Sequence, residues 1–398
     1  MTVRLKELYE QALAQGHDIV LVTGSKGLER PVRWVHMVEN EEIAGFLEGQ
    51  EIAFTTGIGL ESQAGLKELV ASAYHCGASG IVINLGPFIH SIGPDVIQFC
   101  KERDFPLFRV PWSEHMAQIM HQFSLDITMS EKHSIELAAA LENAIFWPAR
   151  EEMYMEYMEQ DGFGKDWNYC VAVFDVCAVA RGVATGAHVP DSRLDAFVRR
   201  IESLMTMRQW RSVVLTIEHR IVLVFARYAI DAAAAMVHEI LALCVESLAK
   251  NEQIFAGVGK VTHSARCIGK SYHQGLMLDR LQRHRGKPRD PLLYDEAGVD
   301  RLLLSIDDQE ILEDYYINSI GPLIEYDRVN DGDLTQVLNN YLSSSGSIKE
   351  TSERMFVHRN TVNYKISKIQ DLLGVNLSDF SVRMELLIGL HVKELLDC

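Results

Sequence analysis

Short apolar runs of strand length alternate with stretches of helical periodicity over residues 1–125. In the helical stretches, 63–76 and 94–103, apolar residues recur every three to four positions. This alternation predicts an α/β domain with a largely parallel, buried sheet, whose binding crevice lies beyond the carboxyl ends of its strands. The strand-like runs are 18–22, 51–55, 80–84 and 106–110.

A helical pattern then continues from Met116 to about Met158, with Pro148 as its one interruption. A helix of this length between two domains is commonly a dimer seam or a signalling rod, and a helix packed along its own domain is nearly as common. We take 126–165 as a connecting helix. The apolar residues on related faces are Ile119, Phe123, Ile127, Ile135, Leu137 and Leu141.

Residues 166–306 predict a second folding unit. Its apolar runs and helical stretches follow the order strand, helix, strand, strand, helix, strand, which is that of a ferredoxin-like α+β sheet with helices on one face. The turn 218–220 joins the second and third strands as a hairpin. The strands are expected at 169–176, 213–217, 221–226 and 254–261, and the helices at 192–207, 232–250 and 264–284.

An all-α unit is predicted at 331–398, after a helical linker at 307–330. Ser347 offers an N-cap oxygen, and Glu350 three residues later completes a capping box. A short helix, a turn of three to four residues and a second, outward helix have the spacing of a helix-turn-helix. The helices are expected at 334–342, 348–355 and 360–372, the last ended by Gly374.

Charge distinguishes this C-terminal unit from the rest of the chain. At about 150 residues per domain, 398 residues allow two or three domains. The formal net charge of −17 argues against a protein that binds nucleic acid or an anionic membrane with its whole surface, because like charges repel. Segment 347–370, however, holds five basic residues against two acidic ones. A small positive element in an acidic chain suits a DNA-binding site with a small footprint.

The outward side chains of this segment suit DNA. Asn and Arg can make bidentate contacts with base edges in the major groove, while Thr, Tyr and Lys suit phosphate oxygens. An ordinary solvated helix face is the alternative when spacing alone is considered. The candidate DNA-binding residues are Ser347, Lys349, His358, Arg359, Asn360, Thr361, Asn363, Tyr364, Lys365 and Lys368.

A candidate effector loop follows the run 51–55. Its glycines leave amide N–H groups accessible and its threonines offer hydroxyls, but the third glycine of a dinucleotide fingerprint is missing. A tight strand-to-helix turn is the alternative. The candidate effector-binding residues are Trp34, Thr55, Thr56, Gly57, Asn84 and Trp112.

Two enzymatic alternatives have little support in the residues. Asp175 ends the first strand of the middle unit, where nucleotidyl cyclases of this fold hold a metal, but the turn Glu218-His219-Arg220 adds only one acid. Ser91, near His90 and Asp95, lacks the spacing that activates a serine. We therefore expect no catalytic residues. A metabolite-converting enzyme or a nucleotidyl cyclase with an autoregulatory DNA-binding tail remains the alternative.

The cysteines and the N-terminus set the remaining expectations. The seven Cys residues form no CxxC pair and meet no His cluster at zinc-finger spacing, so neither a disulfide framework nor a metal site is indicated. The first residues read as an amphipathic helix with an early acid, not as a signal peptide, and no uncharged apolar stretch approaches eighteen residues. We expect a soluble, cytoplasmic protein without a cofactor.

Residues 346–362 closely resemble the C-terminal helix-turn-helix of the PucR family of bacterial transcriptional regulators; they read GSIKETSERMFVHRNTV. Residues 291–303 and 321–327 resemble that family's connection from a GGDEF-like middle domain to the DNA-binding end. The purine-catabolism-regulator domain at the family's N-terminus is resembled by residues 32–36, 54–60 and 110–112. The resemblance implies a ligand-responsive regulator of nitrogen or carbon catabolism, with purine derivatives, amino acids and diacids as candidate effectors.

A regulator of this kind is expected to act as a homodimer or a larger assembly. One recognition helix buries too little surface for tight specific binding, and two half-sites roughly 34 Å apart are the usual remedy. A metabolite that binds one conformer of the sensor domain would change the spacing or freedom of the two helices. The expected partners are operator DNA and a small metabolite, and RNA polymerase is a further candidate.

The family usually has Arg at the positions of Asn363 and Lys365, so the operator sequence of relatives does not transfer to this chain. A guanidinium fork holds different base and phosphate groups than an amide or an ammonium does. We predict that Asn363→Arg changes sequence preference and leaves folding intact, as measured by selection of sites from a random DNA library. Unchanged selection would refute this prediction.

Overall fold

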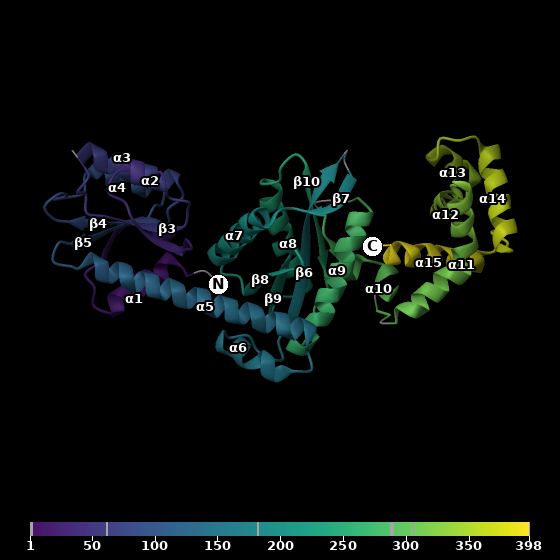
Figure 1. The fold of residues 1–398 in the computed structure, drawn as a ribbon, viewed down its shortest axis with the longest axis horizontal. Coiled ribbons are helices and arrows are strands. Elements are labelled where there is room, and N and C mark those ends of the chain that lie inside the picture. The colour runs from purple at the N-terminus through teal and green to yellow at the C-terminus, as the bar shows by residue number, and fades with distance from the viewer. Residues whose placement is uncertain are drawn as a thin grey trace.

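The computed structural model describes residues 3–60, 63–180, 183–286, 290–303, 305–306 and 308–397. Three lobes follow one another along the long axis of the molecule: an α/β domain, a middle domain built on a second sheet, and an all-helical C-terminal domain (Figure 1). One helix, α5 (Met116–Phe146), runs from the first lobe to the second (Figure 1). The multidomain α/β and α+β architecture predicted from the sequence is therefore confirmed.

The sheet of the first lobe has the order β1-β5-β4-β3-β2. Its strands β2 to β5 pair in parallel, and β1 pairs antiparallel with β5 at one edge. The predicted, largely parallel sheet is confirmed, but β2 was not predicted because its residues are half exposed at the other edge. The strands are β1 (Val20–Thr23), β2 (Trp34–Met37), β3 (Glu51–Thr55), β4 (Gly80–Leu85) and β5 (Leu107–Pro111).

Helices cover both faces of this sheet. The helices α2, α3 and α4 pack on one face, where Leu69, Val70 and Ile81 share a core. On the other face, α1 and the first half of α5 bury Leu8 and Phe123 against the strands. The helical elements are α1 (Leu5–Ala14), η1 (Ser25–Glu29), α2 (Glu41–Ala44), α3 (Gln63–His75) and α4 (Pro94–Glu102).

Helix α5 belongs to two cores. Ile119 and Phe123 are buried in the first lobe, whereas Leu137 and Leu141 are buried in the middle domain. Ile135, one of the apolar residues on related faces of this helix, is 70% exposed.

The long helix also ends earlier than predicted. Trp147 leaves the helical conformation, since a following proline disfavours it, and Pro148 has no amide N–H to continue the hydrogen bonding. The chain resumes in η2 (Glu151–Met153) and α6 (Met155–Gln160).

The middle sheet has the order β11-β10-β6-β9-β8, with β7 paired to β6. Its four central strands are antiparallel and confirm the predicted ferredoxin-like arrangement. The extra strands β7 and β11 were not predicted. The strands are β6 (Tyr169–Ala180), β7 (Val183–His188), β8 (Ser212–Ile217), β9 (Arg220–Ala226), β10 (Glu252–Val258) and β11 (Leu292–Leu293).

The prediction that helices lie on one face of this sheet is wrong. The crossover helices α7 (Asp191–Arg208) and α8 (Ile230–Val245) cover one face. The other face is covered by the end of α5 and by α9, which follows η3 (Ala265–Cys267) and spans Ile268–His284. Strand β6 is buried on both sides because its successive side chains enter the two cores in turn.

The third lobe is helical, as predicted. Helices α12, α13 and α14 share a core with α11 and α15, and α15 was not predicted. No helix among the described residues has both the length and the apolar character needed to cross a membrane. After η4 (Tyr294–Glu296), the helices are α10 (Asp300–Leu303), α11 (Gln309–Asn330), α12 (Leu334–Ser343), α13 (Ile348–Arg354), α14 (Arg359–Leu373) and α15 (Phe380–Leu396).

The contact between α9 and β10 tolerates no side chain at Gly257. A Cβ atom there would lie 2.1 Å from the carbonyl oxygen of Gly275 and 2.3 Å from the amide nitrogen of Asp279. We predict that Gly257→Ala destabilises the protein by about 3 kcal/mol or more, because the backbone of a packed helix must move. The thermal unfolding midpoint measures this.

The matched control for this substitution is Gly65→Ala in α3, where the new Cβ meets nothing closer than 3.5 Å. It should leave stability unchanged or raise it by up to about 1 kcal/mol, because Ala favours a helix more than Gly does. Equal unfolding midpoints for the two variants would contradict the packing argument.

Candidate functional site

The helix-turn-helix predicted from the sequence is present in the third lobe. The Ser347 hydroxyl oxygen accepts a hydrogen bond from the Glu350 amide at 3.3 Å and caps α13. Four residues separate α13 from α14, whose apolar side buries Val362, Ile366 and Ile369. Helix α14 lies at the outer end of the lobe, away from the other two lobes (Figure 1).

The N-terminus of α14 is open to solvent. His358 is its N-cap, and the His358 Nδ1 accepts a hydrogen bond from the Asn360 amide at 3.2 Å. The amides of a first helical turn and the helix dipole favour an anion such as a phosphate group there. The predicted candidates that are exposed on α13, α14 and the turn between them are Lys349, His358, Arg359, Asn360, Thr361, Asn363 and Tyr364.

The outward position predicted for Lys365 and Lys368 is wrong. Lys365 donates to the carboxylate of Asp333 at 2.6 Å, and Lys368 donates to the hydroxyl of Tyr326 with its Nζ 4.3 Å from the centre of that ring. Both lysines are half buried. They fasten α14 to the start of α12 and to α11, so they hold the orientation of the outward face.

Phe356 is an exposed residue of this surface that sequence reasoning missed. It lies in the turn between α13 and α14, is 95% exposed and has a φ of +55°. A residue other than glycine loses roughly 1 kcal/mol of conformational free energy when its backbone adopts this left-handed region. The strained turn presents an uncovered aromatic ring beside the first turn of α14. Helical periodicity gives no sign of it, because the residue belongs to no helix.

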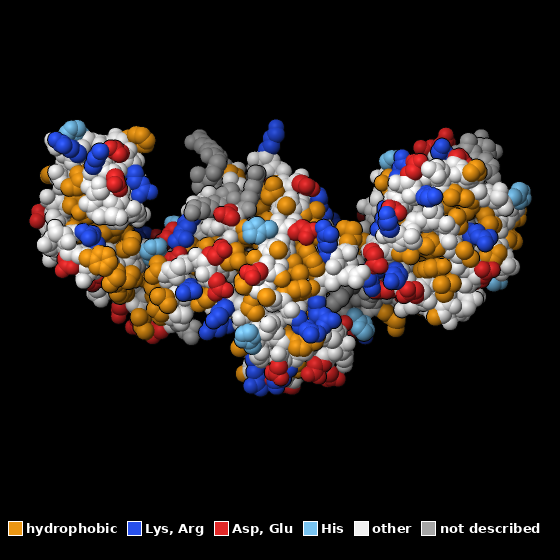
Figure 2. Space-filling view, turned by 180° about the vertical axis from the view of Figure 1, so that it is seen from behind, with side chains coloured by type: hydrophobic (Ala, Val, Ile, Leu, Met, Phe, Trp, Pro, Cys, Tyr) orange, Lys and Arg blue, Asp and Glu red, His pale blue; other side chains and the backbone are white. Residues whose placement is uncertain are grey.

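Charged side chains of both signs are scattered over the three lobes on the face seen in Figure 2. No lobe presents a surface of one sign in that view, which agrees with the expectation that the chain does not bind nucleic acid with its whole surface. Within the helix-turn-helix, Lys349, Arg354 and Arg359 are exposed and carry positive charge.

In the first lobe, an internal carboxylate occupies the candidate effector loop. Glu39 accepts hydrogen bonds from the hydroxyls of Thr55 at 3.1 Å and Thr56 at 2.7 Å. It also accepts from the amides of Thr56 at 3.2 Å, Gly57 at 2.9 Å and Ile58 at 3.3 Å. The donors that the sequence offered to an effector are thus bound to Glu39, which sequence reasoning missed.

Five of the six effector candidates meet at one edge of the sheet. Thr55 ends β3, and Thr56 and Gly57 follow it. The Asn84 side chain near the end of β4 donates to the Pro111 carbonyl at 3.2 Å, next to Trp112. Trp34 lies apart, because it pairs with the first residue of β3, at the opposite edge of the sheet.

Arginine side chains surround Asp175, the residue at the metal-binding position of nucleotidyl cyclases. Its carboxylate contacts Nη1 of Arg283 at 3.2 Å, Nδ1 of His188 at 3.2 Å and Nε of Arg220 at 3.7 Å. Glu218, the second acid considered from the sequence, is exposed and lies 3.8 Å from Arg220. In the described part of the chain, no group of three or more His, Cys, Asp or Glu side chains is placed to hold a metal ion.

A second buried carboxyl group lies beside Asp175. Asp279 on α9 is fully buried, and its nearest cationic atom is Nε of Arg220 at 3.8 Å. Within the described part of the chain, its two carboxyl oxygens have no hydrogen-bond partner. Burial and the neighbouring Asp175 raise the pKa of Asp279 well above its ordinary value.

Three stretches of the chain match known families. Residues 7–127 match the purine catabolism regulatory protein-like family, residues 149–277 match the GGDEF-like domain, and residues 334–392 match the PucR C-terminal helix-turn-helix domain. Together these matches cover most of the chain.

Curated relatives from Bacillus subtilis (strain 168) match shorter stretches. The proline-responsive transcriptional activator PutR is 29% identical over 49% of this chain and 48% of its own length. The purine catabolism regulatory protein is 35% identical over 26% of this chain and 19% of its own length. The DNA-binding transcriptional activator AdeR is 18% identical over 37% of this chain and 35% of its own length. The chain therefore spans about half, or less, of the length of these relatives.

The raised pKa of Asp279 makes stability depend on pH. A carboxyl group whose folded pKa exceeds its unfolded value of 3.8 loses stability as the pH rises from that value towards the raised one. We predict that Asp279→Asn raises the thermal unfolding midpoint, and that the difference from the unchanged protein grows as the pH rises above about 4.

Asp314→Asn on the exposed side of α11 is the control, and its difference from the unchanged protein should not vary with pH. A pH-independent effect of Asp279→Asn would show that the carboxyl group has an ordinary pKa.

Proposed function

The chain belongs to the PucR family, with a PucR-type N-terminal domain, a GGDEF-like middle domain and a PucR C-terminal helix-turn-helix, and on this premise we propose that it is a ligand-responsive transcriptional regulator that binds operator DNA. The observation that carries the proposal is α14. Its apolar side is buried, while its first turn is exposed at the outer end of the molecule.

The candidate DNA-binding side chains of α13, α14 and the turn between them divide into two roles. Asn360 and Asn363 suit base edges in the major groove, as does Arg359, whose guanidinium can hold a guanine with two hydrogen bonds. Ser347, Lys349, His358, Thr361 and Tyr364 suit phosphate oxygens and set the register of the helix on the duplex. Lys365 and Lys368 contribute by holding α14 in place and by adding positive potential near the backbone.

The effector is proposed to be a small metabolite of nitrogen or carbon catabolism. Purine derivatives, amino acids and diacids stay candidates. The names of two relatives support this theme, since one is a proline-responsive activator and another a purine catabolism regulatory protein. Sensing is assigned to residues 1–125, with 126–165 as the connection to the middle domain at 166–306. The linker 307–330 then leads to the DNA-binding unit at 331–398.

Packed elements connect sensing to DNA binding. Helix α5 enters the cores of the first two lobes, and α9 and α15 share a small core that contains Leu281 and Val392. Arg285, just after α9, pairs with Glu394 of α15 and Asp300 of α10, both at 2.9 Å. We propose that a bound effector selects one arrangement of these elements, and that a homodimer converts it into the spacing of two α14 helices on DNA.

Loss of sequence-selective DNA binding in defined variants tests this function. We predict that Arg359→Ala and Asn360→Ala each weaken binding to the genomic fragments that the unchanged protein selects by roughly tenfold or more. A bidentate base contact is worth about 1–3 kcal/mol, and about 1.4 kcal/mol is a factor of ten. Fluorescence anisotropy at fixed salt concentration measures the affinity.

The control is Arg199→Ala, which removes an exposed arginine from α7 in the middle domain. It should bind as the unchanged protein does. Failure of the unchanged protein to enrich any genomic fragment, or equal affinities for all three variants, would overturn the proposed function.

A further inference from the structure

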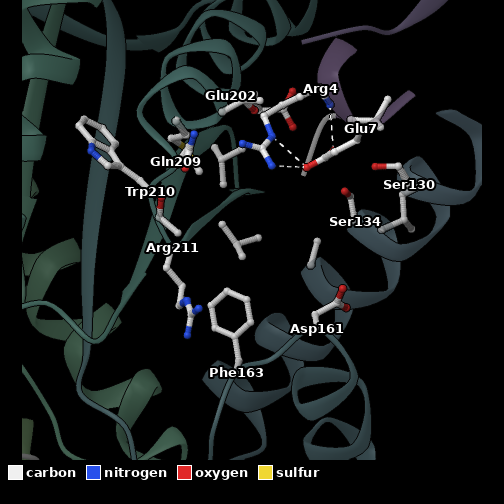
Figure 3. A pocket seen from close by; sticks show the side chains of 18 residues that line it. Arg4, Glu7, Ser130, Ser134, Asp161, Phe163, Glu202, Gln209, Trp210 and Arg211 are labelled. Atoms are coloured by element: carbon white, nitrogen blue, oxygen red, sulfur yellow. Dashed lines mark hydrogen bonds and ion pairs between the residues drawn. The ribbon is translucent and has the colours of Figure 1, made fainter. Parts of the chain in front are cut away.

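A cavity of about 490 Å³ lies between the first two lobes (Figure 3). One wall is made by α1 and α5, with Glu7, Ser130 and Ser134, and the opposite wall by α7 and the start of β8, with Glu202 and Arg211 (Figure 3). A volume of this size suits a small organic ligand. The sequence-based candidates for effector binding do not line it, because they lie at the edges of the first sheet.

Most charges of the cavity are already compensated. Arg4 donates to the carboxylates of Glu7 at 2.9 Å and Glu29 at 2.7 Å. Glu202 pairs with Arg33 across the two lobes. The guanidinium of Arg211 lies 4.9 Å from the ring centre of Trp167.

Asp161 is compensated less well. It follows α6 and lies at the opposite end of the cavity from Arg4 and Glu7 (Figure 3). The basic side chain within 4 Å of it in the described residues is His133, whose Nδ1 is 3.9 Å away and whose side chain is 61% exposed. Burial raises the pKa of Asp161 by more than the neighbouring positive charge lowers it.

One apolar residue of the lining is left uncovered. Ile135 is 70% exposed, although α5 buries residues on both sides of it, Ile127 in the first lobe and Leu137 in the middle domain. The apolar body of a ligand would cover Ile135.

We propose that this cavity binds a small metabolite that carries a protonated amine on an apolar body, with the amine paired to Asp161. The inference rests on the proposed function only in identifying this metabolite as the effector. Of the acidic residues in the lining, Glu7 and Glu202 already have arginine partners, which leaves Asp161 as the carboxylate for a cationic group of the ligand.

An amine bound here would join the two lobes. In the structure, the pair between Arg33 and Glu202 and the hydrogen bond from Gln209 to Glu29, at 3.1 Å, already cross between them. A ligand that contacts both walls stabilises the arrangement in which those contacts form, which is how binding would select one conformer of the regulator.

The test uses the full chain and a panel of butylamine, hexylamine and benzylamine, each with its matched alcohol and carboxylate. Isothermal titration calorimetry at pH 7 should show that at least one amine binds with a Kd of about 1 mM or tighter, as expected for ligands of this size. The matched alcohol and carboxylate should bind at least tenfold more weakly. Asp161→Asn should weaken amine binding at least tenfold.

Asp166→Asn is the matched control, since Asp166 is an exposed carboxylate five residues away that does not line the cavity. It should bind amines as the unchanged protein does. Neither substitution should lower the thermal unfolding midpoint. The inference is overturned if no amine binds, if amines and alcohols bind equally, or if Asp161→Asn leaves affinity unchanged.

Selection of genomic DNA fragments by the same preparations separates this inference from the proposed function. A protein that selects fragments but binds no amine overturns the amine site alone. A protein that binds amines through Asp161 but selects no fragment overturns the regulator and leaves the site standing.

Discussion

The close packing of α9 on the middle sheet is the contact on which the rest of the molecule depends. Near its start, Gly269 leaves room for the backbone of Ile145 at the end of α5, and further along Gly275 lies against Gly257 of β10. Its last turn places Leu281 in the core shared with α15. Helix α9 thus contacts both α5, which comes from the first lobe, and α15 of the third lobe. Because these contacts are close-packed, a shift of α9 must displace both helices.

The same helix explains why the middle domain suits transmission better than catalysis. It supplies Asp279 and Arg283 to the buried group around Asp175, while Arg220 comes from the start of β9, the strand next to β6 in the sheet. The guanidinium groups of Arg220 and Arg283 pair with Asp175, whereas a nucleotidyl cyclase needs this carboxylate free to hold metal ions. Buried ion pairs of this kind add little to the net free energy of folding. They require an accurate arrangement of the side chains, because a displaced partner leaves a buried charge unpaired.

Sequence patterns predicted the elements whose neighbours are close in the chain. The runs that became β3 and β4 are buried almost throughout, and the helix-turn-helix follows from its cap, turn and apolar stripe. Contacts between distant residues were not predictable. No sequence pattern distinguishes Lys365 from an exposed lysine, because its partner Asp333 is brought beside it only by folding. Likewise, no sequence pattern indicates that Glu39 binds the loop after β3. The exposure of Ile135 also depends on how two lobes meet, which helical periodicity does not encode.

The length of α5 gives it a mechanical property. Its 31 residues span about 46 Å at 1.5 Å per residue, and both ends are fixed in packed cores. A rigid rod of that length acts as a lever arm: a tilt of about 5° at one end displaces the other by about 4 Å, comparable to the rise of one base pair. If the chain acts as the proposed homodimer, angular changes of this size where the first two lobes meet are comparable to the dimensions of the DNA helix, and they would change the spacing of half-sites that the dimer reaches.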